Sequence, residues 1–216
     1  MPVSEKEQQQ INSLVRRFEA DTGIEAVAAV VGKADAYPEI PWKAYAIGSA
    51  FGALAAVLFP FLLTDWSIAS TLAFTAFAIL GAGAAFAVAA TLIPALGRLF
   101  LDRLRAQAEA RQCALALFVE REVFRARDRC SVLLLVTRFE RVAVILPDSG
   151  LAPHAPPAEL DLIARAMREA YVKDGAPAAF ESALAALATL VRQRGYSPPA
   201  TRENTLDDAM VAEKRL

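Results

Sequence analysis

Two aspartates are the residues of this chain best suited to binding a metal ion. Asp35 and Asp148 each follow closely on an apolar stretch of the length of a strand. Carboxylate oxygens hold Mg²⁺ or Ca²⁺, so two converging aspartates would support metal-dependent hydrolysis. The alternative is that Asp148, in the segment 147–150 (PDSG), only forms a turn. We favour the turn, and the distance between the two carboxylates discriminates between these interpretations.

No pair of catalytic nucleophile and base is recognisable elsewhere. His154 is the single histidine and lies in a proline-rich loop, where we expect it to be solvated. Gly32-Lys33 lacks the remainder of a phosphate-binding P-loop. Cys113 and Cys130 have neither metal-binding nor redox spacing, and we expect free thiols in a reducing compartment. The sequence therefore assigns no catalytic, metal-binding or cofactor-binding residue.

Charged residues follow the ends of two expected strands, Ile24–Val31 and Ser131–Thr137. In an open α/β sheet, ligands bind beyond the carboxyl ends of the parallel strands. A crevice there would be lined by Lys33, Asp35, Arg138 and Arg141. It would suit a lipid head group or the cytoplasmic loop of a membrane partner. The alternative is that these charges only settle the domain on an anionic surface.

The elements that must position these residues are those of a small α/β domain. A capping box of Ser4 and Glu7 begins a helix that Gly23 ends. Apolar spacing and stop signals predict three more helices: Leu99 to about Phe124, one through Leu160 that stops at Gly175, and one from Pro177 to Gly195.

Three short apolar runs predict strands. They are Ile24–Val31, Ser131–Thr137 and Arg141–Leu146, of which the last two form a β-hairpin. Neither part of the chain alone has enough strands to bury the face of a sheet. We therefore expect the first strand to pair in parallel beside the second.

The chain is also unusually apolar, with 56% hydrophobic residues. Between Ala44 and Leu96 the only charged residue is Asp65. Ala44–Thr64 and Ile68–Leu96 are each long enough to cross a bilayer as a helix. The alternative, two buried core helices of a soluble protein, is disfavoured by the length of these uncharged runs. We expect a two-helix transmembrane hairpin inserted in the α/β domain.

Basic and aromatic residues flank the two spans. The residues expected at the membrane interface are Trp42, Lys43, Trp66 and Arg98. Because the loop between the spans has no Lys or Arg, the positive-inside rule places both termini in the cytoplasm. The polar start, Met1 to Gln10, predicts no cleavable signal peptide. We expect a multi-pass protein of the cell's inner (cytoplasmic) membrane.

Small residues within the spans predict close helix packing. They are the pairs Gly48 with Gly52 and Gly81 with Ala85. We favour packing inside the hairpin, and the alternative is an interface between two copies. Neither span contains an ionisable residue, which disfavours a transporter. The predicted divisions are residues 1–40 and 98–196 for the α/β domain, 41–97 for the hairpin and 197–216 for a charged tail.

Several short segments resemble the TPM-domain family, in its bacterial branch with a membrane hairpin inside the domain. They are residues 21–25 (DTGIE), 36–38 (AYP), 129–136 (RCSVLLLV), 140–142 (ERV), 145–146 (IL), Pro198-Pro199, Asn204 and Leu206. The resemblance implies a compact TPM-like α/β sandwich and, for some members, acid phosphatase activity or roles in assembling and repairing membrane complexes.

Three functions follow as expectations. The first is a non-enzymatic interaction or assembly module for membrane complexes. The alternatives are a metal-dependent acid phosphatase, which the resemblance alone implies, and a lipid-sensing or oligomer-forming hairpin. The expected partners are membrane lipid and another membrane protein or a second copy. A net charge of −1 gives no reason to expect nucleic acid.

Overall fold

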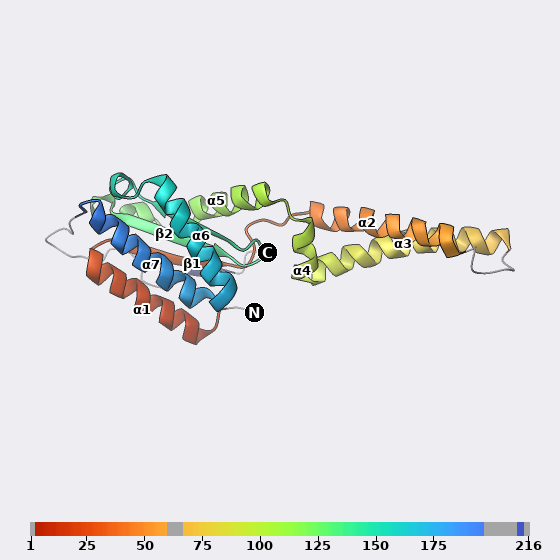
Figure 1. The fold of residues 1–216 in the computed structure, drawn as a ribbon, viewed down its shortest axis with the longest axis horizontal. Coiled ribbons are helices and arrows are strands. Elements are labelled where there is room, and N and C mark those ends of the chain that lie inside the picture. Colours follow the sequence, from red (N-terminus) through yellow and green to blue (C-terminus); the bar gives the residue numbers. More distant parts are fainter. Residues whose placement is uncertain (1–2, 60–66, 197–210, 214–216) are drawn as a thin grey trace. The chain divides into compact units, whose positions relative to one another are not determined.

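The chain divides into two compact units. A computed structural model describes residues 3–59, 67–196 and 211–213. The α/β unit comprises Met1–Asp35 and Leu104–Leu216, and the helical unit comprises Ala36–Arg103. Figure 1 shows their elements, of which most are helices. The helical unit is thus an insertion in the sequence of a mixed α/β unit.

The sheet of the α/β unit has the strand order β3-β2-β1-β4. Its strands are β1 (Glu25–Val31), β2 (Ser131–Thr137), β3 (Val142–Pro147) and β4 (Val211–Glu213). β1 and β2 are parallel along their whole length, which confirms the predicted pairing. β3 runs antiparallel to β2 and completes the predicted hairpin.

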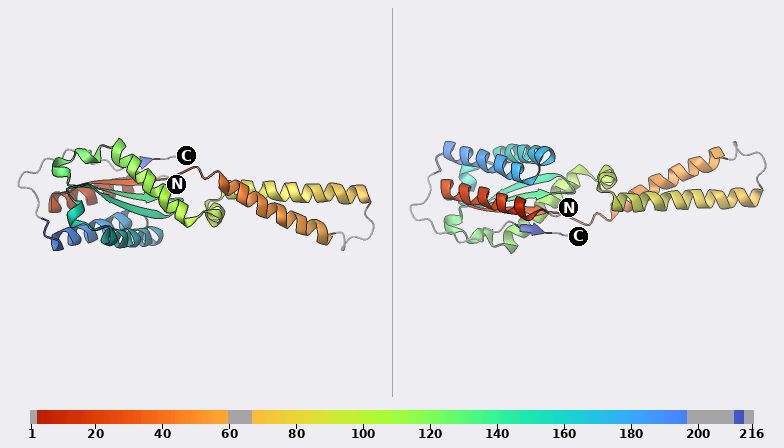
Figure 2. Two further views of the ribbon diagram at one scale, coloured as in Figure 1. Left: turned by 90° about the horizontal axis from the view of Figure 1, so that it is seen from above. Right: turned by 90° about the horizontal axis from the view of Figure 1, so that it is seen from below.

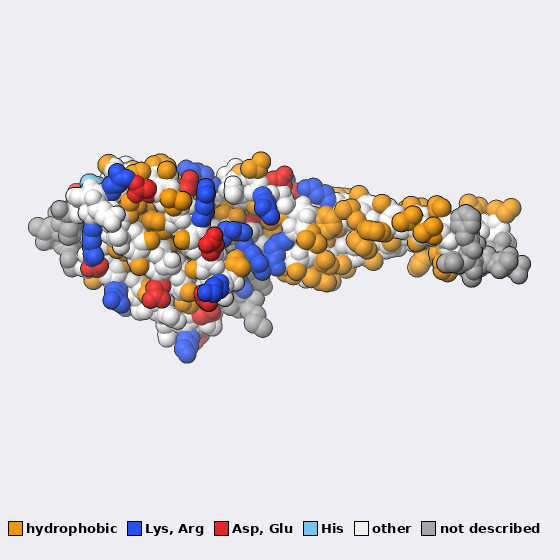
Figure 3. Space-filling view, viewed as in Figure 1, with side chains coloured by type: hydrophobic (Ala, Val, Ile, Leu, Met, Phe, Trp, Pro, Cys, Tyr) orange, Lys and Arg blue, Asp and Glu red, His pale blue; other side chains and the backbone are white. Residues whose placement is uncertain are grey.

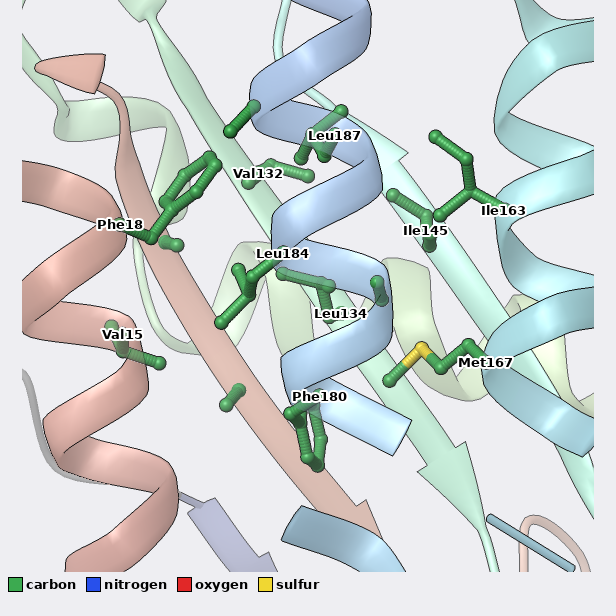
Figure 4. Close-up of a cluster of buried hydrophobic side chains, with 14 of the residues drawn as sticks. Val15, Phe18, Val132, Leu134, Ile145, Ile163, Met167, Phe180, Leu184 and Leu187 are labelled. Carbon is green, nitrogen blue, oxygen red and sulfur yellow. The ribbon is translucent and has the colours of Figure 1, made fainter. Parts of the chain in front are cut away.

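Helices cover both faces of this sheet (Figures 1 and 2). One face packs against α1 (Glu5–Thr22), α6 (Pro157–Asp174) and α7 (Ala176–Gln193), and the other against α5 (Arg103–Glu120). Alternate residues of β1 enter different cores, because side chains alternate across a strand. Ala28 joins the core that contains Phe18 and Phe180, part of which Figure 4 shows. Val27 joins the core that contains Leu117.

Capping residues set the ends of α1. The Ser4 hydroxyl accepts from the backbone N–H of Glu7, whose carboxylate accepts in turn from the Ser4 N–H over 2.8 Å. This reciprocal arrangement satisfies N–H groups that have no partner inside the helix. Gly23 ends the helix at φ +70°, a conformation that favours glycine. The predicted capping box and helix end are confirmed.

Two predicted helix boundaries are wrong. The single helix from Leu99 to Phe124 is broken, because Leu101 is extended between the 3₁₀ helix η2 (Arg98–Phe100) and α5. The apolar helix expected to reach Leu96 ends earlier: Pro94 has no N–H to continue it and begins the short helix α4 (Pro94–Gly97). Within the predicted charged tail, the described residues 211–213 form β4, which pairs in parallel with β1.

Two long apolar helices form the main part of the helical unit. They are α2 (Glu39–Leu58) and α3 (Ile68–Leu92), which lie side by side in opposite directions (Figure 1). α2 begins earlier than the predicted Ala44, with Pro41 in its first turn, where a missing N–H costs little. Residues 60–66, which include Trp66 and most of the predicted loop, lie outside the described residues.

Candidate functional site: the carboxyl edge of the sheet and the apolar helix pair

Asp35 and Asp148 lie at opposite ends of the sheet. Asp35 follows the carboxyl end of β1, whereas the N–H of Asp148 donates to the carbonyl of Ser131 at the start of β2. The seven residues of β1 separate the two ends by about 20 Å. One metal ion cannot bind both carboxylates, because each ligand oxygen must lie within about 2.6 Å of it. The described residues contain no group of three or more His, Cys, Asp or Glu that could hold a metal ion.

Asp148 instead holds the turn that leaves β3. Its Oδ1 accepts from the N–H of Ser149 over 2.6 Å, and its Oδ2 lies 2.9 Å from the Nε of Arg129. The turn packs tightly there, since a Cβ on Gly150 would lie 2.2 Å from the carbonyl oxygen of Asp128. The interpretation of Asp148 as a turn residue is confirmed.

Asp35 is part of an ion pair within the α/β unit. Its Oδ2 lies 2.9 Å from the Nη2 of Arg105, near the start of α5. Because the side chains of Arg105 and Asp35 are 41% and 32% exposed, the pair contributes at most about 1 kcal/mol to stability. The pair also shows where the chain leaves and re-enters the α/β unit. The exit after Asp35 and the return before Arg105 lie side by side.

The other predicted crevice residues gather at the same edge of the sheet. The turn between β2 and β3 is bound to the end of β1, since the Arg138 N–H donates to Val31 and the Phe139 N–H to Gly32. The Lys33 ammonium lies 5.0 Å from the centre of the Phe139 ring, a distance typical of a cation–π contact. Arg141 follows in the same turn, and its φ of +55° is rare outside glycine.

Two residues that the sequence analysis did not single out fix this turn. Glu140 is only 8% exposed, and its Oε1 accepts from the N–H of Ala34 over 2.8 Å. Arg168 of α6 donates through its Nε to the carbonyl of Arg141 over 2.7 Å. Both contacts join residues that are well separated in the sequence, so no local sequence pattern predicts them.

The start of α1 belongs to this edge as well. Hydrogen bonds from the backbone and then the hydroxyl of Ser4 lower the pKa of Glu7, and the positive charge of Arg138 lowers it further. Limited burial acts in the opposite direction. Glu7 is therefore ionised at neutral pH, and its charge offsets part of the positive charge of Arg138.

His154 and Tyr196 meet at the opposite end of the sheet. The two rings are 5.4 Å apart in an edge-to-face contact, and the His154 Nδ1 lies 3.1 Å from the carbonyl oxygen of Arg194. Burial raises the pKa of the Tyr196 hydroxyl, and Cys130 and Asp128 raise it further, so it stays protonated at neutral pH. His154 is partly exposed to solvent, as expected, and its contacts also bind its loop to the end of α7.

Glycines bring α2 and α3 of the helical unit into backbone contact. A Cβ on Gly48 would lie 2.5 Å from the carbonyl oxygen of Ala82, and one on Gly52 would lie 2.2 Å from that of Ala78. On α3 the glycine in close contact is Gly83, whose added Cβ would lie 2.4 Å from the Ser49 Oγ. The small residues therefore pack the two helices of one chain together.

Gly81 and Ala85, the other predicted packing pair, face away from α2. A Cβ on Gly81 would meet only the Phe77 ring of the same helix, at 3.9 Å, and Ala85 is exposed. Sequence reasoning missed Gly83 because small residues occur all around α3 and give no preferred face.

Apolar side chains cover most of the described helix pair on the face that Figure 3 shows. α3 is the one helix among the described residues that is long and apolar enough to cross a membrane, and 6% of its most apolar stretch is buried. A core helix of a soluble protein would be mostly buried. α2 does not meet this criterion over its described residues, which include Glu39 and Lys43. Large exposed apolar side chains nevertheless continue along it, including Phe51, Leu54 and Val57.

Three of the predicted interface residues lie at one end of the helix pair. Trp42 is 73% exposed near the start of α2, with Lys43 beside it. The Lys43 Nζ lies 3.3 Å from the carbonyl oxygen of Phe100, so the start of α2 lies beside the segment that follows α3. In that segment the Arg98 Nε donates to the carbonyl of Pro94. Both basic residues thus lie at the end of the pair where the chain enters and leaves.

Comparison with known proteins yields one structural likeness. No protein-family model matches the chain, and no curated protein matches it. The chain is similar to the BA42 protein from the psychrophilic bacterium Bizionia argentinensis, whose structure was determined by NMR. The identity is 9%, the match covers 97% of this chain and 94% of that one, and the TM-score is 0.54. At this identity the likeness concerns the fold alone.

Proposed function

We propose that this chain is an integral membrane protein in which α2 and α3 cross the inner membrane as a hairpin. The observation that carries the proposal is the exposed apolar surface of the helix pair, of which α3 is almost unburied along its most apolar stretch. Monomeric soluble proteins rarely expose large continuous apolar surfaces, which instead mark contact with a membrane or a partner. α3 has 25 residues and a length of about 37 Å, which exceeds the hydrocarbon thickness of a bilayer.

The α/β unit then acts as a cytoplasmic, non-enzymatic interaction or assembly module. Its predicted metal pair is separated by the length of the sheet, which leaves the phosphatase alternative supported by the TPM resemblance alone. Membership of the TPM-domain family is likewise a proposal that rests on the sequence segments. Gly48 and Gly52 are already in contact with α3 of the same chain, so they are not available as contacts between two copies.

Cysteine labelling tests the topology. Ser67, the N-cap of α3, lies at the end of the pair remote from Lys43 and Arg98. In intact spheroplasts, a membrane-impermeant maleimide should label Ser67→Cys and leave Ser4→Cys unlabelled until the membrane is permeabilised. The unaltered protein is the matched control, because its Cys113 and Cys130 belong to the α/β unit and should also stay unlabelled. Labelling of Ser4→Cys from outside, or release of the protein by an alkaline wash, would refute the proposal.

A further inference from the structure

Two exposed arginines meet at the turn between β2 and β3. The guanidinium of Arg168 lies against the backbone of Arg141, bound through its Nε to the carbonyl. Within the described part of the chain, neither side chain forms an ion pair with Asp or Glu. Guanidinium groups match the oxygens of phosphate in geometry and charge. Because Arg168 binds the backbone of Arg141, both positive charges belong to the same turn, and together they attract an anion.

The backbone of this turn is already fixed. Its first two N–H groups donate to the end of β1, at Val31 and Gly32. The acid of the turn, Glu140, points inward to the N–H of Ala34, so its carboxylate is withdrawn from the surface that carries Arg141. Since the turn is held before any ligand arrives, binding would cost little additional ordering.

The chain leaves the α/β unit at this edge of the sheet, because Asp35 follows the end of β1. In the sequence, only residues 32–38 stand between β1 and α2. The chain also returns at this edge, as the pair of Asp35 with Arg105 indicates. The geometry points to Arg141 and Arg168 as a binding site for the phosphate of an anionic membrane lipid. This inference rests on the proposed function, since α2 must enter the membrane for lipid to be within reach.

Hydrogen exchange of the full chain in lipid nanodiscs tests the inference. One set of nanodiscs contains phosphatidylcholine alone, and the other also contains phosphatidylglycerol. For the unaltered protein, peptides that cover the turn should exchange more slowly in the anionic discs, and added salt should remove the difference. Arg141→Asn should raise the fraction of phosphatidylglycerol needed for half of the effect by about fivefold.

The variants are chosen to separate charge from folding. Arg141→Asn removes the charge but keeps the carbonyl that Arg168 binds, and asparagine tolerates a positive φ. Arg141→Asn with Arg168→Ala should abolish the effect. The matched control, Arg17→Ala with Arg111→Ala, removes two exposed arginines from the middle of α1 and α5 and should leave it unchanged.

The remaining outcomes overturn the assignment. Equal protection in the two kinds of disc, or protection that both turn variants retain, would show that these arginines bind no anionic lipid. Protection in phosphatidylcholine discs on addition of inorganic phosphate would identify free phosphate as the ligand. Extraction by an alkaline wash would instead refute the membrane proposal, so the two failures are distinguishable.

Discussion

At the scale of single residues, the helical unit depends most directly on glycines. Where α2 and α3 meet, the absent side chains of Gly48 and Gly52 let the backbone of α3 come close, and Gly83 leaves room for the side chains of Ser49 and Tyr45. In an apolar environment such contacts hold helices together by dispersion, because burying apolar surface there gives no hydrophobic gain. Substitutions at these positions should therefore act through packing.

Gly52 and Gly81 should respond in opposite directions to the same change. Gly52→Ala forces a methyl group against the carbonyl of Ala78 and should destabilise the helix pair by about 1–3 kcal/mol. Gly81→Ala meets only ordinary contact, and the better helix propensity of alanine should stabilise α3 by up to about 1 kcal/mol. Thermal unfolding of the detergent-solubilised protein, followed by circular dichroism, measures both. Equal shifts of the two variants would contradict the packing in the structure.

At the scale of elements, the sequence predicts β1 and β2 well because each is a continuous apolar run between turn residues. The three residues of β4 are too few to show a period of two, and their pairing is set by the exposed edge of β1. The break at Leu101 has one signal in the sequence, Asp102, a residue type that favours the position just before a helix, and the expectation of a single long helix overlooked it.

At the carboxyl edge of the sheet, the sequence predicts the parallel pairing of β1 with β2, and this pairing places Lys33 and Arg138 at the same edge. The hydrogen bond from Arg168 to Arg141 depends on tertiary packing, so it could not be predicted from the sequence.

The cap of α1 should make stability depend on pH. The folded pKa of Glu7 is below its unfolded value, so the folded state binds fewer protons. The stabilisation is present above about pH 4.3, the ordinary value for Glu, and is lost as pH falls through the folded pKa. Glu7→Gln should cost about 0.5–1 kcal/mol at neutral pH.

Thermal unfolding of the two proteins across the acidic range measures this effect. The difference between them should shrink as pH falls. Glu5→Gln, which alters the same turn outside the capping box, should produce no such trend. A difference that stays constant down to the most acidic condition would contradict the role of Glu7 in the cap.

At the scale of the whole molecule, the two ends of the chain are interdependent. The first 35 residues supply α1 and β1, and β1 lies between β2 and β4 in the sheet. Everything after the helical unit therefore folds around a strand that precedes it in the sequence. Because the crossover from β1 to β2 contains the helical unit, an interaction module of this design cannot be translated to completion before its helices emerge.

Removing the helical unit should leave a soluble, folded α/β unit. The Asp35 and Arg105 side chains are 2.9 Å apart, so a short glycine–serine linker in place of residues 36–103 can join the two segments without strain. We expect this protein to unfold cooperatively in urea and to remain in the supernatant after ultracentrifugation. Residues 98–216 alone lack β1 and α1. They should be insoluble or lack fixed tertiary packing, because β2 loses the strand paired along one edge and the core around Phe180 loses α1. A stable, cooperatively unfolding 98–216 fragment would contradict the dependence of the sheet on β1. An insoluble linked protein would show instead that the α/β unit needs the helices to fold.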